Sequence, residues 1–168
     1  TVGGKPLFCT KAQVFKIWVF GKGIEILGMI KIFKVDKSTG KELRKAAKSL
    51  KEHNSNNGAL TPYLVAFPEG TRTKDKGYKM SEFKRGLFTI AIKYDLPIIP
   101  IASYGGLDVT PKSSWIFKKG TIYEKILEPL FPKNYGGSSI KEKSILLQND
   151  TRQRINQGLH ELIRTYGN

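Results

Sequence analysis

Residues 64–72, Leu-Val-Ala-Phe-Pro-Glu-Gly-Thr-Arg, are the stretch that decides how this chain folds. The apolar run Tyr63–Phe67 has the length of a strand and stops at Pro68, which cannot donate the backbone hydrogen bond that a central strand needs. Gly70 lets the backbone turn where a Cβ would clash. The pattern therefore predicts a β-strand that ends in a tight turn.

Three functional groups follow that strand: the Glu69 carboxylate, the Thr71 hydroxyl and the Arg72 guanidinium. In open α/β sheets, ligands bind at the carboxyl ends of the strands. A planar guanidinium beside a hydroxyl and free backbone N–H groups suits a phosphate, which it can hold through two hydrogen bonds. The spacing alone fits a phosphate site and an ordinary turn with a surface ion pair equally well.

Two later stretches carry a resemblance. Residues 83–88, Phe-Lys-Arg-Gly-Leu-Phe, begin a predicted helix, and residues 96–101, Leu-Pro-Ile-Ile-Pro-Ile, form a predicted buried strand. With the first stretch, in this order and at this distance, they resemble the glycerolipid acyltransferases, and above all the 1-acylglycerol-3-phosphate acyltransferases. The resemblance is clear from Pro6 to Ile101.

The resemblance implies phospholipid biosynthesis: transfer of a fatty acyl group from acyl-coenzyme A or acyl carrier protein to the sn-2 hydroxyl of lysophosphatidic acid, giving phosphatidic acid. Arg72 would bind the acceptor phosphate with help from Lys37. Glu69 would orient the acceptor or brace Arg72, while Gly70 and Thr71 would supply close backbone and hydroxyl contacts. It also implies association with a membrane, with the active site on the cytoplasmic side. No ligand cluster implies a metal or tightly bound cofactor.

Lys37 belongs to a weaker match. Relatives often carry an Asp-Arg pair after the strand that corresponds to Ile30–Asp36, and here the basic residue is a lysine. A lysine is a point charge, so its contact with a phosphate would be less directional than that of an arginine. A solvated surface lysine is the alternative.

The family's catalytic pair, a His and an Asp separated by four residues, is missing. Five positions after His53 stands Gly58, and five after His160 stands Thr165. The general base for the acceptor hydroxyl is therefore absent, and these 168 residues are predicted to be inactive. Truncation at the N-terminus would explain the absence, and so would a relative that binds lipid phosphate without chemistry. We expect His160 to be structural or to face solvent.

The net charge is +15, from 29 Lys and Arg against 14 Asp and Glu. Such an excess favours nucleic acid, an anionic membrane surface or phosphorylated substrates. Six of the basic residues fall between positions 72 and 85. A non-catalytic basic domain that binds anionic lipid or nucleic acid is thus the competing function. No nucleic-acid signature is visible, so we expect lipid rather than nucleic acid.

Strands alternate with helices along the chain, which predicts an α/β fold with a mostly parallel sheet flanked by helices, in a single domain over residues 1–168. The predicted strands are Ile30–Asp36, Tyr63–Phe67, Pro97–Ser103, Trp115–Phe117 and Thr121–Leu127, and the predicted helices are Thr39–His53 (capped by Thr39), Ser81–Tyr94 (capped by Ser81) and one carrying Ile155, Leu159, Leu162, Ile163 and Tyr166. Gly86 would let the second helix approach the sheet.

A further helix is predicted from Thr10, with Val14, Phe15 and Trp18 on one face. That face either packs on the sheet or, with the neighbouring lysines, lies against lipid. No signal peptide is visible and no apolar run reaches the roughly 20 residues of a membrane span. The single Cys9 is predicted to be a small core residue.

Overall fold

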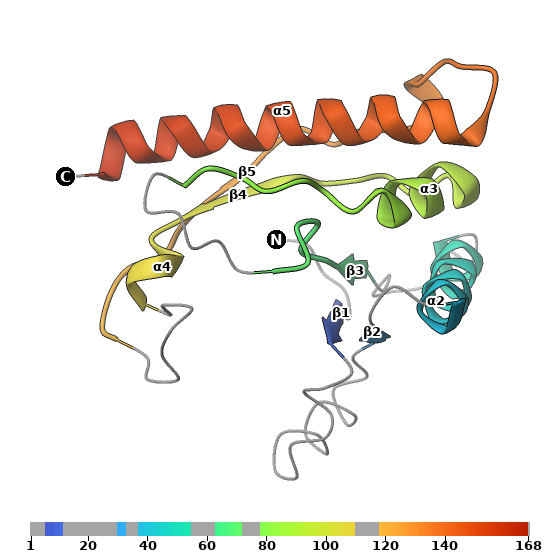
Figure 1. Ribbon diagram of the computed structural model, residues 1–168, viewed down its shortest axis with the longest axis horizontal. Coiled ribbons are helices and arrows are strands. Elements are labelled where there is room, and N and C mark those ends of the chain that lie inside the picture. The colour runs from blue at the N-terminus through green and yellow to red at the C-terminus, as the bar shows by residue number, and fades with distance from the viewer. Residues whose placement is uncertain are drawn as a thin grey trace, which may run out of the picture. The chain divides into compact units, whose positions relative to one another are not determined.

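A computed structural model describes residues 6–11, 30–32, 37–54, 63–71, 78–109 and 118–167 of the chain (Figure 1). The chain divides into two compact units, residues 1–67 and 68–168. The boundary falls between Phe67 and Pro68, at the point where the sequence predicts that the strand ends.

The first unit contains a parallel three-stranded sheet. Strand β1 (Pro6–Lys11) lies between β2 (Ile30–Ile32) and β3 (Tyr63–Val65), and both of its pairings are parallel. Strands were predicted at the positions of β2 and β3, and both are present. Because Thr10 and Lys11 belong to β1, the helix predicted from Thr10 does not begin there, and the rest of its predicted length lies outside the described residues.

Helix α2 (Lys37–Asn54) confirms the helix predicted between β2 and β3. Ala47 and Leu50, which lie three residues apart on this helix, are buried. The helix starts two residues before the predicted cap, so Thr39 lies inside it and Lys37 is its first residue. Lys37 therefore does not stand in a loop after a strand.

The second unit is built around one long helix. Its elements are α3 (Arg85–Tyr94), β4 (Ile101–Tyr104), the short α4 (Gly106–Val109), β5 (Tyr123–Ile126), the 3₁₀ turn η2 (Pro132–Asn134) and α5 (Ile140–Tyr166). Figure 1 shows α5 running along this unit, where it contacts both α3 and β4.

Strand β4 pairs with β5 in antiparallel fashion, with Ile101 opposite Ile126 and Tyr104 opposite Tyr123. The sequence predicted this stretch as a strand of a parallel sheet, so its described pairing differs from the prediction. The strand begins at Ile101, directly after Pro100, which has no N–H for a ladder. The structure thus combines a parallel sheet in one unit with an antiparallel pair in the other.

The core of the second unit lies where α5 meets α3 and β4. Leu147 is fully buried, and the buried side chains packed around it are Phe83, Phe88, Ala91 and Leu130. A second cluster joins Ala102 of β4 to Leu159 and Leu162 of α5. Leu159 and Leu162, two apolar residues of the predicted last helix, thus lie in this core.

The start of α5 has its own hydrogen bonds. The Ser139 side chain accepts a bond from the Glu142 N–H at 3.1 Å, which caps the helix. The Glu142 carboxylate accepts bonds from the backbone and the hydroxyl of Ser138, and these bonds lower the pKa of Glu142. These bonds fix the beginning of the helix at Ile140. The sequence predicted this helix only from the spacing of residues 155–166, so the helix starts earlier than those residues.

None of the described helices is long and apolar enough to cross a membrane.

We expect Leu147→Ala to lower the free energy of unfolding by about 2–5 kcal/mol, because it removes a fully buried side chain and leaves a cavity. The matched control is Leu146→Ala on the same helix, where the side chain is 45% exposed and the loss should be well below that range. Urea unfolding followed by circular dichroism measures both. Equal losses would contradict the placement of Leu147 in the core.

Candidate functional site

The turn after β3 has the conformation that the sequence predicts. Gly70 has a φ of +65°, in the left-handed region that L-residues rarely adopt. A Cβ built at this position would meet only Lys84 side-chain carbons at 3.8 Å, an ordinary contact distance. Glycine is therefore needed here for its backbone angle, which is the turn that the sequence predicted.

Two backbone N–H groups hold this turn in place. The Ser81 N–H donates to Glu69 Oε2 at 2.8 Å, and the Lys84 N–H donates to the Pro68 carbonyl oxygen at 2.7 Å. Both donors lie in the segment that leads into α3. The Glu69 carboxylate thus has a defined role in the structure, which is to tie the turn to that segment.

This arrangement corrects one prediction about α3. The helix begins at Arg85 and its N-cap is Lys84, whose side chain makes no capping hydrogen bond, so Ser81 is not the cap. Ser81 instead gives its N–H to Glu69, twelve positions away. A Cβ built on Gly86 would meet no atom of the described residues within 4 Å.

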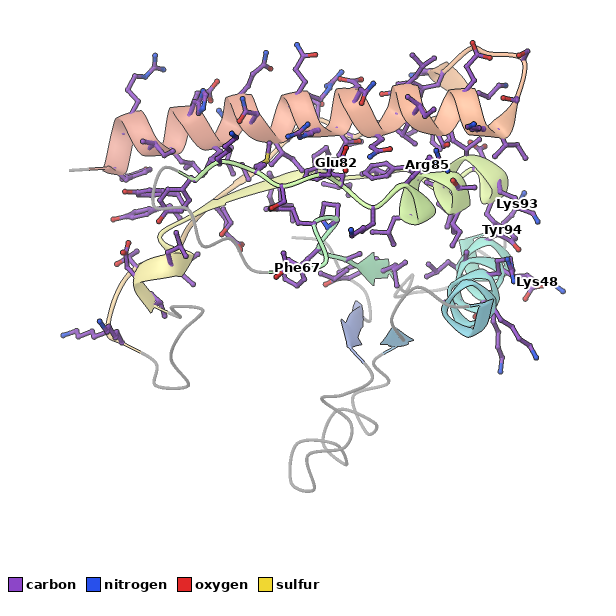
Figure 2. All side chains as sticks on the ribbon, in the orientation of Figure 1. Lys48, Phe67, Glu82, Arg85, Lys93 and Tyr94 are labelled. Carbon is purple, nitrogen blue, oxygen red and sulfur yellow. The ribbon has the colours of Figure 1, made fainter. Side chains whose placement is uncertain are left out.

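Lys84 is a functional candidate that the sequence placed only in the run of basic residues between positions 72 and 85. Its Cγ and Cε each lie 3.8 Å from the Cβ position of Gly70, so the alkyl chain passes over the turn and carries the ammonium group there. Lys84 also belongs to the Phe-Lys-x-Gly block. Figure 2 shows the exposed Arg85 next along the chain, at the start of α3. The first N–H groups of a helix also favour an anion.

The structure brings together some of the predicted site residues. Glu69, Gly70 and Thr71 share one turn, beside which lies Lys84. Arg72 lies outside the described residues. Lys37 belongs to α2 in the other unit, and its side chain is not described. The described part of the site is therefore a turn with basic and hydroxyl groups along it.

An open groove of about 480 Å³ lies beside the same segment, between residues Tyr78–Met80 and α5. Its lining includes Lys79, Arg152 and His160, and no Asp or Glu among the described residues. Tyr78 also lines the groove, and burial raises the pKa of its hydroxyl, so the hydroxyl stays protonated there. The groove adds to the positive character of this side of the unit.

Of the two histidines, only His160 has a described side chain. His160 is exposed on α5, as predicted. His53 lies in the last turn of α2, and its side chain is not described. In the described residues, no group of three or more His, Cys, Asp or Glu side chains is placed to hold a metal ion.

Comparison with known proteins gives a consistent result. The family model named Acyltransferase matches residues 2–104. The chloroplastic 1-acyl-sn-glycerol-3-phosphate acyltransferase BAT2 of Brassica napus is 27% identical over 95% of this chain and 42% of its own length, and a 1-acyl-sn-glycerol-3-phosphate acyltransferase of Saccharomyces cerevisiae is 35% identical over 47% of this chain and 26% of its own. The chain thus spans less than half the length of these relatives.

A solved structure is also similar. The crystal structure of the 1-acyl-sn-glycerophosphate acyltransferase PlsC from Thermotoga maritima matches with a TM-score of 0.67 and 30% identity, over 94% of this chain and 57% of that chain. At this identity the likeness extends to the α/β fold, which agrees with the fold class predicted from the sequence.

The two glycines near the site should respond in opposite ways to the same substitution. Gly70→Ala should lower the free energy of unfolding by about 1–2 kcal/mol, because alanine is strained at a φ of +65°. Gly86→Ala should raise it by about 0.4–1 kcal/mol, since the residue is helical and a Cβ has space. Urea denaturation of both variants beside the parent protein gives the signs, and the same sign for both would contradict this account of the turn.

Proposed function

Because this chain belongs to the acyltransferase family, we propose that it is the acceptor-binding part of an enzyme that transfers a fatty acyl group to the sn-2 hydroxyl of lysophosphatidic acid. The product is phosphatidic acid, and the donor is a thioester, either acyl-coenzyme A or acyl carrier protein. The observation that carries the proposal is the turn at Glu69–Thr71 with the Lys84 side chain across Gly70.

Acceptor binding follows from the charges at the turn. The acceptor phosphate binds the Arg72 guanidinium through two hydrogen bonds, and the Lys84 ammonium adds a point charge beside it. Lys37 is a further candidate for the same phosphate. Gly70 and Thr71 contribute backbone and hydroxyl contacts.

Glu69 has a different role in this proposal. A carboxylate repels a phosphate, and the Glu69 side chain is half-buried with its Oε2 on the Ser81 N–H. Glu69 therefore acts as a positioning residue that holds the turn through its hydrogen bond to the Ser81 N–H. This leaves the acceptor phosphate to the basic groups.

The membrane is the proposed setting of this reaction. The net charge of +15 favours an anionic lipid surface, where lysophosphatidic acid resides. The competing function is a lipid-binding domain without chemistry. In its favour, neither His53 nor His160 is followed by an aspartate five positions later, as the family's catalytic motif requires.

The first prediction of this proposal concerns Arg72. In an active form of the protein, Arg72→Ala should raise the KM for lysophosphatidate roughly ten- to hundredfold, because a charge-assisted bidentate contact contributes about 1.5–3 kcal/mol. Arg72→Lys should restore little of this loss. Lys93→Ala, at the far end of α3, removes the same charge and should leave KM close to the parent value. Unchanged acceptor kinetics in Arg72→Ala would rule out the phosphate role.

The second prediction is that the 168 residues alone form no phosphatidate. A positioned general base contributes ~10²–10⁴-fold to the rate, and neither His53 nor His160 has the partner that the family motif requires. The assay measures labelled phosphatidate from lysophosphatidate and acyl-coenzyme A, with and without an upstream extension that carries a His-x-x-x-x-Asp motif. Comparable turnover by both chains would overturn the catalytic assignment.

A further inference from the structure

Two peptide groups before α3 are hydrogen-bonded on both sides. In the peptide group between Met80 and Ser81, the carbonyl oxygen accepts a bond from Arg152 Nη2 at 3.2 Å. The N–H of the same peptide group donates to Glu69 Oε2 at 2.8 Å. A guanidinium and a carboxylate therefore bind opposite ends of one peptide dipole.

The peptide group between Phe83 and Lys84 repeats this arrangement. Its carbonyl oxygen accepts a bond from Gln148 Nε2 at 2.8 Å, and its N–H donates to the Pro68 carbonyl oxygen at 2.7 Å. Phe83 is buried, so its carbonyl group needs such a partner. In both peptide groups, α5 binds the oxygen and the turn binds the N–H.

Simple geometry explains why both peptide groups separate the same two elements. The described chain has no cis peptide bond, and in a trans peptide group the C=O and N–H point in opposite directions. Gln148 and Arg152 are four residues apart on α5, so their side chains share one face of the helix. The segment 80–84 thus lies between that face and the turn.

The bonds on the two sides of each peptide group strengthen each other. A donor at the carbonyl oxygen polarises the peptide group and makes its N–H a better donor. The effect is largest between Met80 and Ser81, where both outer partners carry a full charge. Removing Arg152 should therefore weaken the bond between Ser81 and Glu69, although Arg152 and Glu69 share no hydrogen bond.

We propose that Arg152 and Gln148 are positioning residues of the turn at Glu69–Thr71, acting through these two peptide groups. Both lie on α5, outside the residues 2–104 that the family model matches. The hydrogen-bond coupling stands on the structure alone, and its consequence for acceptor binding rests on the function proposed above.

A double-mutant cycle tests the coupling without any substrate. The equilibrium constant of unfolding is measured by urea denaturation for Glu69→Ala, Arg152→Ala and the double variant. Each single substitution should raise the equilibrium constant of unfolding. We expect the rise in the double variant to be smaller than the product of the two single rises, by a factor of roughly two to ten. The control cycle pairs Glu69→Ala with Arg154→Ala, whose guanidinium bonds to Asp150 instead, and should show a factor near one. No coupling between Glu69 and Arg152, or equal coupling in both cycles, would overturn the proposal.

Kinetics of an active form test the consequence for the site. Arg152→Ala and Gln148→Ala should each raise the KM for lysophosphatidate several-fold with little change in kcat, because they loosen acceptor binding and leave the chemistry intact. Arg152→Lys keeps a donor for the Met80 carbonyl and should recover most of the loss, while Arg154→Ala should leave KM unchanged. If KM stays at the parent value in an active enzyme, the positioning role is wrong. Absence of all activity on lysophosphatidate would instead count against the proposed function, and the unfolding cycle would still decide the coupling.

Discussion

The close contact between α5 and β4 is the constraint on which the second unit depends. A Cβ built at Gly158 would lie 3.1 Å from the Ala102 side chain and 3.1 Å from a Leu127 methyl group, so a larger residue there would require these neighbours to move by a few tenths of an ångström. Leu159 and Leu162 pack beside this point, and Leu147 is buried further along the helix. A helix held at both places cannot slide along its axis without losing one of them, and its register is thereby fixed.

That register carries over to the candidate site. With α5 fixed, Gln148 donates to the carbonyl oxygen of Phe83 and Arg152 donates to that of Met80. The N–H groups of the same two peptide groups donate to the turn. The turn therefore depends on a helix that begins about seventy residues later in the chain. Without the Gln148 side chain, the carbonyl oxygen of the buried Phe83 would lose this hydrogen-bond partner, at a cost of about 1–3 kcal/mol.

The sequence was informative where the signal is local and silent where it is long-range. The turn at Pro68–Gly70 and helix α2 were predictable, because proline, glycine and the helical spacing of apolar residues act within a few positions. Ser81 was predicted as a helix cap, and the error arose because the Glu69 carboxylate, twelve residues upstream, binds its N–H. The antiparallel pairing of β4 and the roles of Gln148 and Arg152 arise from tertiary contacts, which leave no periodic pattern in the sequence.

The same distinction bears on the carboxylate in the proposed anion site. Read as a sequence, Glu69 stands between basic residues and looks either like a ligand for the acceptor or like a partner for Arg72. In the structure its Oε2 is bound to a peptide N–H, and the far end of that peptide group is bound to the Arg152 guanidinium. The Glu69 carboxylate and the Arg152 guanidinium thus lie at opposite ends of one peptide dipole. In the function proposed above, a phosphate at Thr71 and Arg72 would meet the basic side chains of the segment 78–85, while Glu69 Oε2 is already bound to a peptide N–H of that segment.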